Sequence, residues 1–122
     1  MAVIYTAAVK NARLDAVTTQ IGIAGKLEIG TAAMAAVLVS INLNNPSAAA
    51  AAAGVMTLSG FPKTAAAVAA GTAAAARIRT GASVDIVTGL TVGTSASDIN
   101  LDSTNISTGQ NVTINSATIT HA

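Results

Sequence analysis

The first hydrophobic pattern along the chain has helical spacing. Leu14, Val17 and Ile21 recur three and four residues apart, which places them on one face of a helix. Gly22 follows at the point where a helix would end. We therefore expect a helix over residues 7–21. It would either pack on its own domain or lie as an arm on a neighbouring subunit.

After residue 25 the spacing changes to the alternation that is typical of strands. Residues 37–43 are a clear case, and their odd-numbered side chains, from Val37 to Leu43, are expected to face the core. Further strands are expected over residues 26–30, 55–59, 74–80, 84–88, 90–92, 99–101 and 112–120.

Two details of these strands concern a turn and an irregularity. Residues 74–80 and 84–88 are the best candidate for a hairpin, because residues 80–83 between them are turn formers. In the last strand the hydrophobic positions change parity after Ile114. A β-bulge near residues 115–116 would reconcile the two halves.

Three alanine tracts interrupt this pattern. Residues 48–53 and 65–70 have helical propensity, but isolated helices shorter than about 12–15 residues are marginal in water. Residues 48–53 therefore stay open between helix and loop. Residues 73–76 lead directly into an alternating segment, so we expect a strand there.

Short strands separated by Gly, Asn, Ser and Thr predict an antiparallel β-sandwich or a jelly-roll-like barrel with one N-terminal α-helix. Residues 1–25 would form an N-terminal arm and helix, and residues 26–122 a single β-sandwich domain. So few charges remain to protect the sheet edges that neighbouring subunits are expected to cover them.

The amino-acid composition argues against several classes of function. Charged residues are 9% of the chain, aromatic residues 2%, and the net charge is +1, which argues against nucleic-acid binding. One histidine and no cysteine exclude the common zinc sites and a thiol nucleophile. The mean hydropathy is +0.62, yet polar residues interrupt the longest charge-free stretch, residues 29–62. We expect a chain without a secretory signal or a membrane span.

The polar residues do not form a recognisable catalytic set. Asp98 and Asp102 lie in an oxygen-rich segment that could hold a weak calcium ion, although Asx turns between strands explain it as well. His121 has no partner nearby in the sequence, which favours a surface residue over catalysis. We therefore expect no enzyme, cofactor or metal.

The candidate interface residues are the rare large or charged ones. Arg77 and Arg79 share one strand face, and Asp85 lies across the expected turn, so a cross-strand ion pair is possible. Alternatively the two guanidinium groups contact carboxylates on a partner. Tyr5 and Phe61 are core side chains or interface anchors. The complete candidate set is Tyr5, Leu14, Phe61, Arg77 and Arg79.

The two ends of the chain resemble a family of small virion proteins of tailed bacteriophages. The segments that carry this resemblance are Ala8-Val9-Lys10-Asn11-Ala12-Arg13-Leu14-Asp15-Ala16-Val17, Ile21-Gly22, Leu27-Glu28-Ile29-Gly30-Thr31, Gly89-Leu90-Thr91-Val92-Gly93-Thr94, Asp98-Ile99-Asn100-Leu101, Gly109-Gln110-Asn111-Val112-Thr113-Ile114 and Ala117-Thr118-Ile119-Thr120-His121. The alanine-rich middle departs from the family pattern.

The resemblance implies a phage structural protein that decorates or cements the capsid shell. Its expected partners are the major capsid protein and further copies of itself, as a homotrimer. It would be found on the capsid surface of the virion after assembly in the host cytoplasm. The alternative is a tail-tube, tail-tip or fibre-associated structural protein, because such proteins use similar strands rich in Thr, Ser and Gly.

Overall fold

The computed structural model describes residues 4–22, 24–44, 48 and 50–120. His121, expected to be a surface residue, and residues 45–47, which follow the strand expected over residues 37–43, lie outside the described residues. The elements, in chain order, are α1 (Ala7–Ile21), β1 (Lys26–Gly30), the 3₁₀ turn η1 (Ala32–Met34), β2 (Val37–Asn42), β3 (Val55–Thr57), β4 (Lys63–Ala66), β5 (Gly71–Thr72), β6 (Ala75–Arg79), β7 (Asp85–Gly93), β8 (Ile99–Leu101), β9 (Asn105–Ile106) and β10 (Asn111–Thr120).

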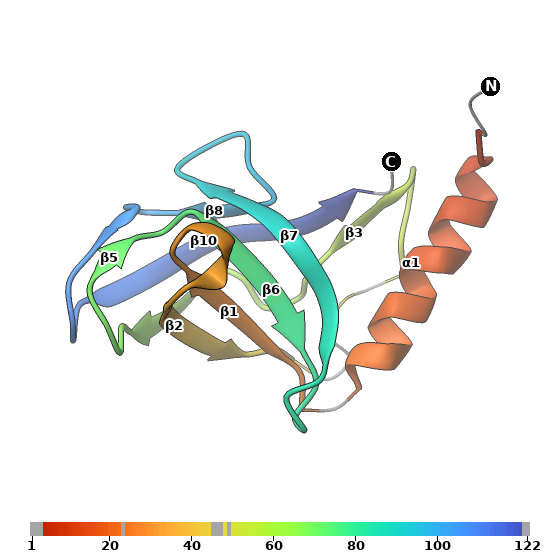
Figure 1. Cartoon of the computed structure of the whole chain (residues 1–122). Coiled ribbons are helices and arrows are strands. Elements are labelled where there is room, and N and C mark those ends of the chain that lie inside the picture. The colour runs from red at the N-terminus through yellow and green to blue at the C-terminus, as the bar shows by residue number, and fades with distance from the viewer. Residues whose placement is uncertain (1–3, 23, 45–47, 49, 121–122) are drawn as a thin grey trace.

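One large sheet curls into a half-barrel, and the helix lies beside it (Figure 1). Its strand order is β2-β1-β6-β7-β8-β10-β3, and β4 also pairs with β10. The strands β5 and β9 form a separate small pair. All these pairings are antiparallel except β7 with β8, which is parallel. The predicted class, mainly β with one N-terminal helix, is confirmed.

The core fills the inner face of the curled sheet. Leu27 and Ile29 of β1, Ile78 of β6 and Ile114 of β10 are all fully buried. On β1 and β6 the residues between them are only partly buried, as the two-residue period of a strand requires. The alternation that predicted these strands therefore also identifies which of their side chains form the core.

The helix α1 has the predicted bounds. It begins after Thr6, whose Oγ1 accepts a hydrogen bond from the N–H of Val9 at 3.4 Å, a typical N-cap. It ends at Ile21, and the following Gly22 has a positive φ of 74°, which glycine tolerates best. Leu14 and Ile21 are buried in the common core. The interpretation of α1 as a packing helix is confirmed.

The expected hairpin and bulge are both present. The strands β6 and β7 pair antiparallel, and the turn between them is closed by a hydrogen bond of 2.9 Å from the N–H of Thr80 to the carbonyl of Val84. The two strands expected at residues 84–88 and 90–92 are one strand, β7, with Gly89 at a φ of 74° inside it. In β10 the pairing register shifts between Ile114 and Ser116, where the bulge was predicted.

Two parts of the pattern differ from expectation. Leu38, which was not among the residues expected to face the core, is fully buried, because the register between β1 and β2 shifts there and Gly30 pairs with Val37. The helical propensity of residues 65–70 is overridden: Ala65 and Ala66 belong to β4, which pairs with β10. That pairing supplies hydrogen bonds that a very short helix cannot make.

The first alanine tract, left open between helix and loop, contains no helix in its described part. Ala48 forms an isolated bridge with Leu58, and Ala52 forms one with Val55. Ala53 and Gly54 then have φ values of 52° and 74°, which produce a tight turn before β3.

Candidate functional site

Four charged side chains meet on the outer face of the sheet, and we call them the charge cluster: Glu28, Arg77, Arg79 and Asp85. In the register, Glu28 of β1 pairs with Arg77 of β6, and Arg79 of β6 pairs with Asp85 of β7. Figure 1 shows these three strands side by side. Because Leu27 and Ile78 face the core, their neighbours along β1 and β6 must face outward.

Ion pairs connect the cluster across the three strands. The Nε of Arg77 donates to Oε1 of Glu28 at 2.7 Å, and the Nη1 of Arg79 lies 3.7 Å from the same oxygen. The Nε of Arg79 is 2.8 Å from Oδ1 of Asp85. That nitrogen is buried and does not hydrogen-bond to any described residue. The short contact with Asp85 is therefore an ion pair whose geometry does not meet that of a hydrogen bond. Glu28 therefore binds both arginines.

The cluster is neutral as a whole and only partly covered. The side chains of Glu28, Arg77 and Arg79 are 16%, 21% and 25% exposed, and that of Asp85 is 48% exposed. The sequence contains six basic and five acidic residues, and two of each meet here. Such a surface can offer polar contacts to a partner without presenting a net charge.

The expectation that Arg77 and Arg79 share one strand face is confirmed, as is the ion pair between Arg79 and Asp85. Sequence reasoning missed Glu28 as their common partner. The alternation of residues 26–30 did place Glu28 outward, but the pairing of β1 with β6 joins segments 49 residues apart. No local pattern indicates a pairing over that separation.

The other candidate interface residues lie on different elements. Leu14 is 3% exposed inside the core of its own chain, so its side chain is not part of the described surface. Phe61, just before β4, is partly buried and packs against the core. Tyr5, before α1, is 40% exposed, and the guanidinium group of Arg13 lies 4.7 Å from the centroid of its ring.

Asp98 and Asp102, the two aspartates of the candidate calcium segment, accept backbone hydrogen bonds from other parts of the chain. Oδ2 of Asp98 accepts a hydrogen bond from the N–H of Thr91, and the Oγ1 of Thr91 accepts one from the N–H of Asp98, both at 3.0 Å. Oδ1 of Asp102 accepts one from the N–H of Thr113 at 3.3 Å. The described residues contain no group of three or more His, Asp or Glu side chains that could hold a metal ion.

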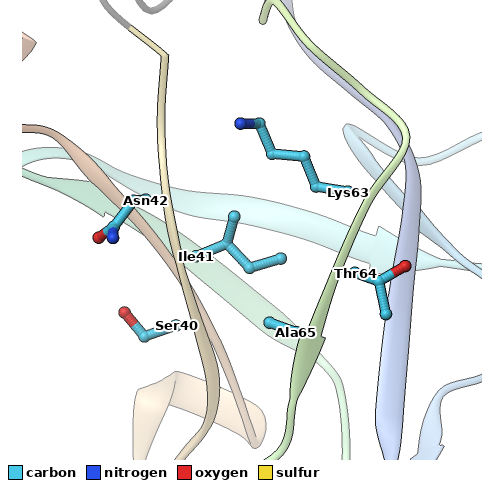
Figure 2. Close-up of a pocket in the computed structure, with 6 residues that line it drawn as sticks. All are labelled: Ser40, Ile41, Asn42, Lys63, Thr64 and Ala65. Atoms are coloured by element: carbon cyan, nitrogen blue, oxygen red, sulfur yellow. The ribbon is translucent and has the colours of Figure 1, made fainter.

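A pocket of about 370 Å³ opens between β2 and β4. It is lined by residues 40–42 and 63–65 (Figure 2). Figure 2 shows the side chains of Ile41, Lys63 and Ala65 pointing into the gap between the two strands. The Nζ of Lys63 donates to Oδ1 of Asn44 at 2.6 Å and lies 5.8 Å from the centroid of the Phe61 ring.

Among the described residues, no helix combines the length and the apolar character needed to cross a membrane. Comparison of the chain with protein-family models, with curated proteins and with solved structures finds no match.

Proposed function

We propose that this chain is a non-enzymatic structural protein of a tailed-bacteriophage virion that binds and stabilises the capsid shell. The resemblance of segments at the two ends of the chain to small virion proteins carries this proposal. Its partners would be the major capsid protein and further copies of the same chain, as a homotrimer on the capsid surface.

The charge cluster supports the proposal by supplying a suitable surface. A protein that covers a lattice is repeated many times, so each copy benefits from a contact face that does not repel its neighbours. Two arginines and two carboxylates on one face of the sheet meet this requirement. Repetition by symmetry then turns many weak contacts into strong retention.

Copy number tests the proposal. A decoration protein is expected to approach the copy number of the major capsid protein in gel densitometry of purified particles, and to stay with heads after heads and tails are separated. A tail-tip or fibre protein would be present in only a few copies. A tail-tube protein would remain with the tails, and either of these results would contradict the proposal.

A matched pair of variants tests whether the charge cluster contacts the capsid. Arg77→Ala combined with Arg79→Ala removes the guanidinium groups, whereas Glu28→Gln weakens the same intrachain ion pairs and keeps both arginines. We expect the arginine variant to leave particles at lower temperature or denaturant concentration than the Glu28→Gln variant. Equal retention of the two variants on particles would show that the two arginines are not part of the contact surface.

A further inference from the structure

Among the described residues, each of the two strands that border the pocket pairs with one strand only, β2 with β1 and β4 with β10. Following the pairings from β2 through β10 to β4 shows that β2 and β4 run antiparallel to each other. At one end they are already joined, because the N–H of Val68, just after β4, donates to the carbonyl of Leu38 at 2.8 Å. We call the remainder of this boundary the seam.

The backbone of β2 presents hydrogen-bonding groups to the seam. The N–H of Leu43 donates to the carbonyl of Gly25 at 2.8 Å, and the antiparallel pairing with β1 continues from there. Residues that exchange hydrogen bonds with a neighbouring strand alternate with residues whose groups point the other way. The N–H and C=O of Ser40 and Asn42 therefore point away from β1, toward β4.

The same alternation applies to β4. The N–H of Ala67 donates to the carbonyl of Gln110 at 2.8 Å, and the pairing with β10 continues through Ala65. The N–H and C=O of Thr64 and Ala66 therefore point away from β10, toward β2.

The two edges match in register. Continuing the antiparallel pairing from Leu38 and Val68 places Ser40 opposite Ala66, and Asn42 opposite Thr64. In each of these pairs, both residues have their backbone groups aimed across the seam. The structure nevertheless has no strand pairing between β2 and β4 within the described residues, and the pocket occupies that position.

The side chain of Lys63 lies in the seam. Lys63 pairs with the fully buried Ile114 on β10, and its side chain points into the gap (Figure 2). In the continued register Lys63 would stand opposite Leu43, which is only 6% exposed. Closing the seam would bring the ammonium group against an apolar side chain and remove water from it, which is costly. An inward-pointing charge on an edge strand also discourages pairing with other chains.

We propose that Lys63 keeps β2 and β4 from pairing. When its charge is removed or covered, the two strands form hydrogen bonds progressively from the Leu38–Val68 end and complete a closed barrel. The open seam, bridged by the hydrogen bond from Lys63 to Asn44, is the resting state of the isolated chain. The inference is independent of the proposed function.

Amide hydrogen exchange of the full chain, measured by NMR, tests whether Lys63 keeps β2 and β4 from pairing. In the unaltered protein the amide of Val68 is expected to be protected, and those of Ser40, Asn42, Thr64 and Ala66 to exchange rapidly. In Lys63→Met these four amides are expected to slow by about tenfold, the size expected for one backbone hydrogen bond. Lys26→Met, which removes a charge from the outer face of β1, is the matched control and should leave them unchanged.

A cross-link gives a second measurement that does not depend on amide assignments. In the closed register Ile41 stands opposite Ala65, close enough for a disulfide between cysteines. Ile41→Cys with Ala65→Cys is expected to oxidise readily in the Lys63→Met background. The control is Ile41→Cys with Thr64→Cys, because the Thr64 side chain points away from the gap. Four protected amides in the unaltered protein, unchanged exchange in Lys63→Met, or equal oxidation of the two cysteine pairs would each overturn the proposal.

Discussion

At the scale of single residues, Glu28 organises the polar face of the sheet. Its carboxylate lies between the guanidinium groups of Arg77 and Arg79, and it is the least exposed member of the charge cluster. Asp85 binds one arginine only and is 48% exposed, so water screens its contact more strongly. The two carboxylates should therefore differ in what they contribute to stability.

We expect Glu28→Gln to lower the free energy of unfolding by about 1 kcal/mol, and Asp85→Asn by only a few tenths of a kcal/mol. Urea denaturation at low salt measures both variants. In about 1 M salt the difference between them should shrink, because the ions screen the remaining charges. A larger loss for Asp85→Asn than for Glu28→Gln would show that Glu28 does not organise the cluster.

At the scale of elements, α1 belongs to the core of the chain that carries it. Leu14 and Ile21 pack with the strands, while Val9, at the N-terminal end of α1, is 43% exposed. The helical spacing predicted which side chains share one face, and the structure shows that this face is buried against its own sheet.

Leu14→Ala is expected to destabilise the whole domain by roughly 2–4 kcal/mol, because it removes buried volume that the neighbours cannot fully refill. Val9→Ala, on an exposed part of the same helix, should cost well below 1 kcal/mol. Urea denaturation followed by far-ultraviolet circular dichroism compares the two. If Leu14→Ala melted only the helical signal and left the strands unchanged, α1 would behave as a detachable arm.

At the scale of the whole molecule, one chain encloses its own core even though it has only one Tyr, one Phe and no Trp. Buried Leu, Ile, Val, Met and Ala side chains fill the inner face of the half-barrel. The long strand β10 pairs with β8 along one side and with β4 and then β3 along the other, so both of its sides are covered. Association with other copies, as proposed, would add stability to a fold that already has a core.

If native copies associate, mass action stabilises the folded state as the concentration rises. The midpoint of thermal unfolding is then expected to increase over about a hundredfold range of protein concentration. Scanning calorimetry measures the midpoint, and light scattering measures the mass at each concentration. A constant midpoint together with a monomer mass would contradict self-association in solution.

The sequence was sufficient for features with a local physical cause. The bounds of α1 follow from its apolar spacing and from Gly22, the β6–β7 turn from residues 80–83, and the bulge in β10 from the change of parity after Ile114. Each of these depends on side-chain period and backbone freedom within a few neighbouring residues, and both can be read directly from the order of amino acids.

The tertiary structure alone decided which segments meet. The parallel pairing of β7 with β8, the strand β4 within an alanine tract, the burial of Leu38 and the position of Glu28 between two arginines all depend on pairings between distant segments. Many registers satisfy the same alternation along a strand, and only the packing of the complete core selects one of them. The local sequence thus determined the elements, and their mutual packing determined the charge cluster and the open seam.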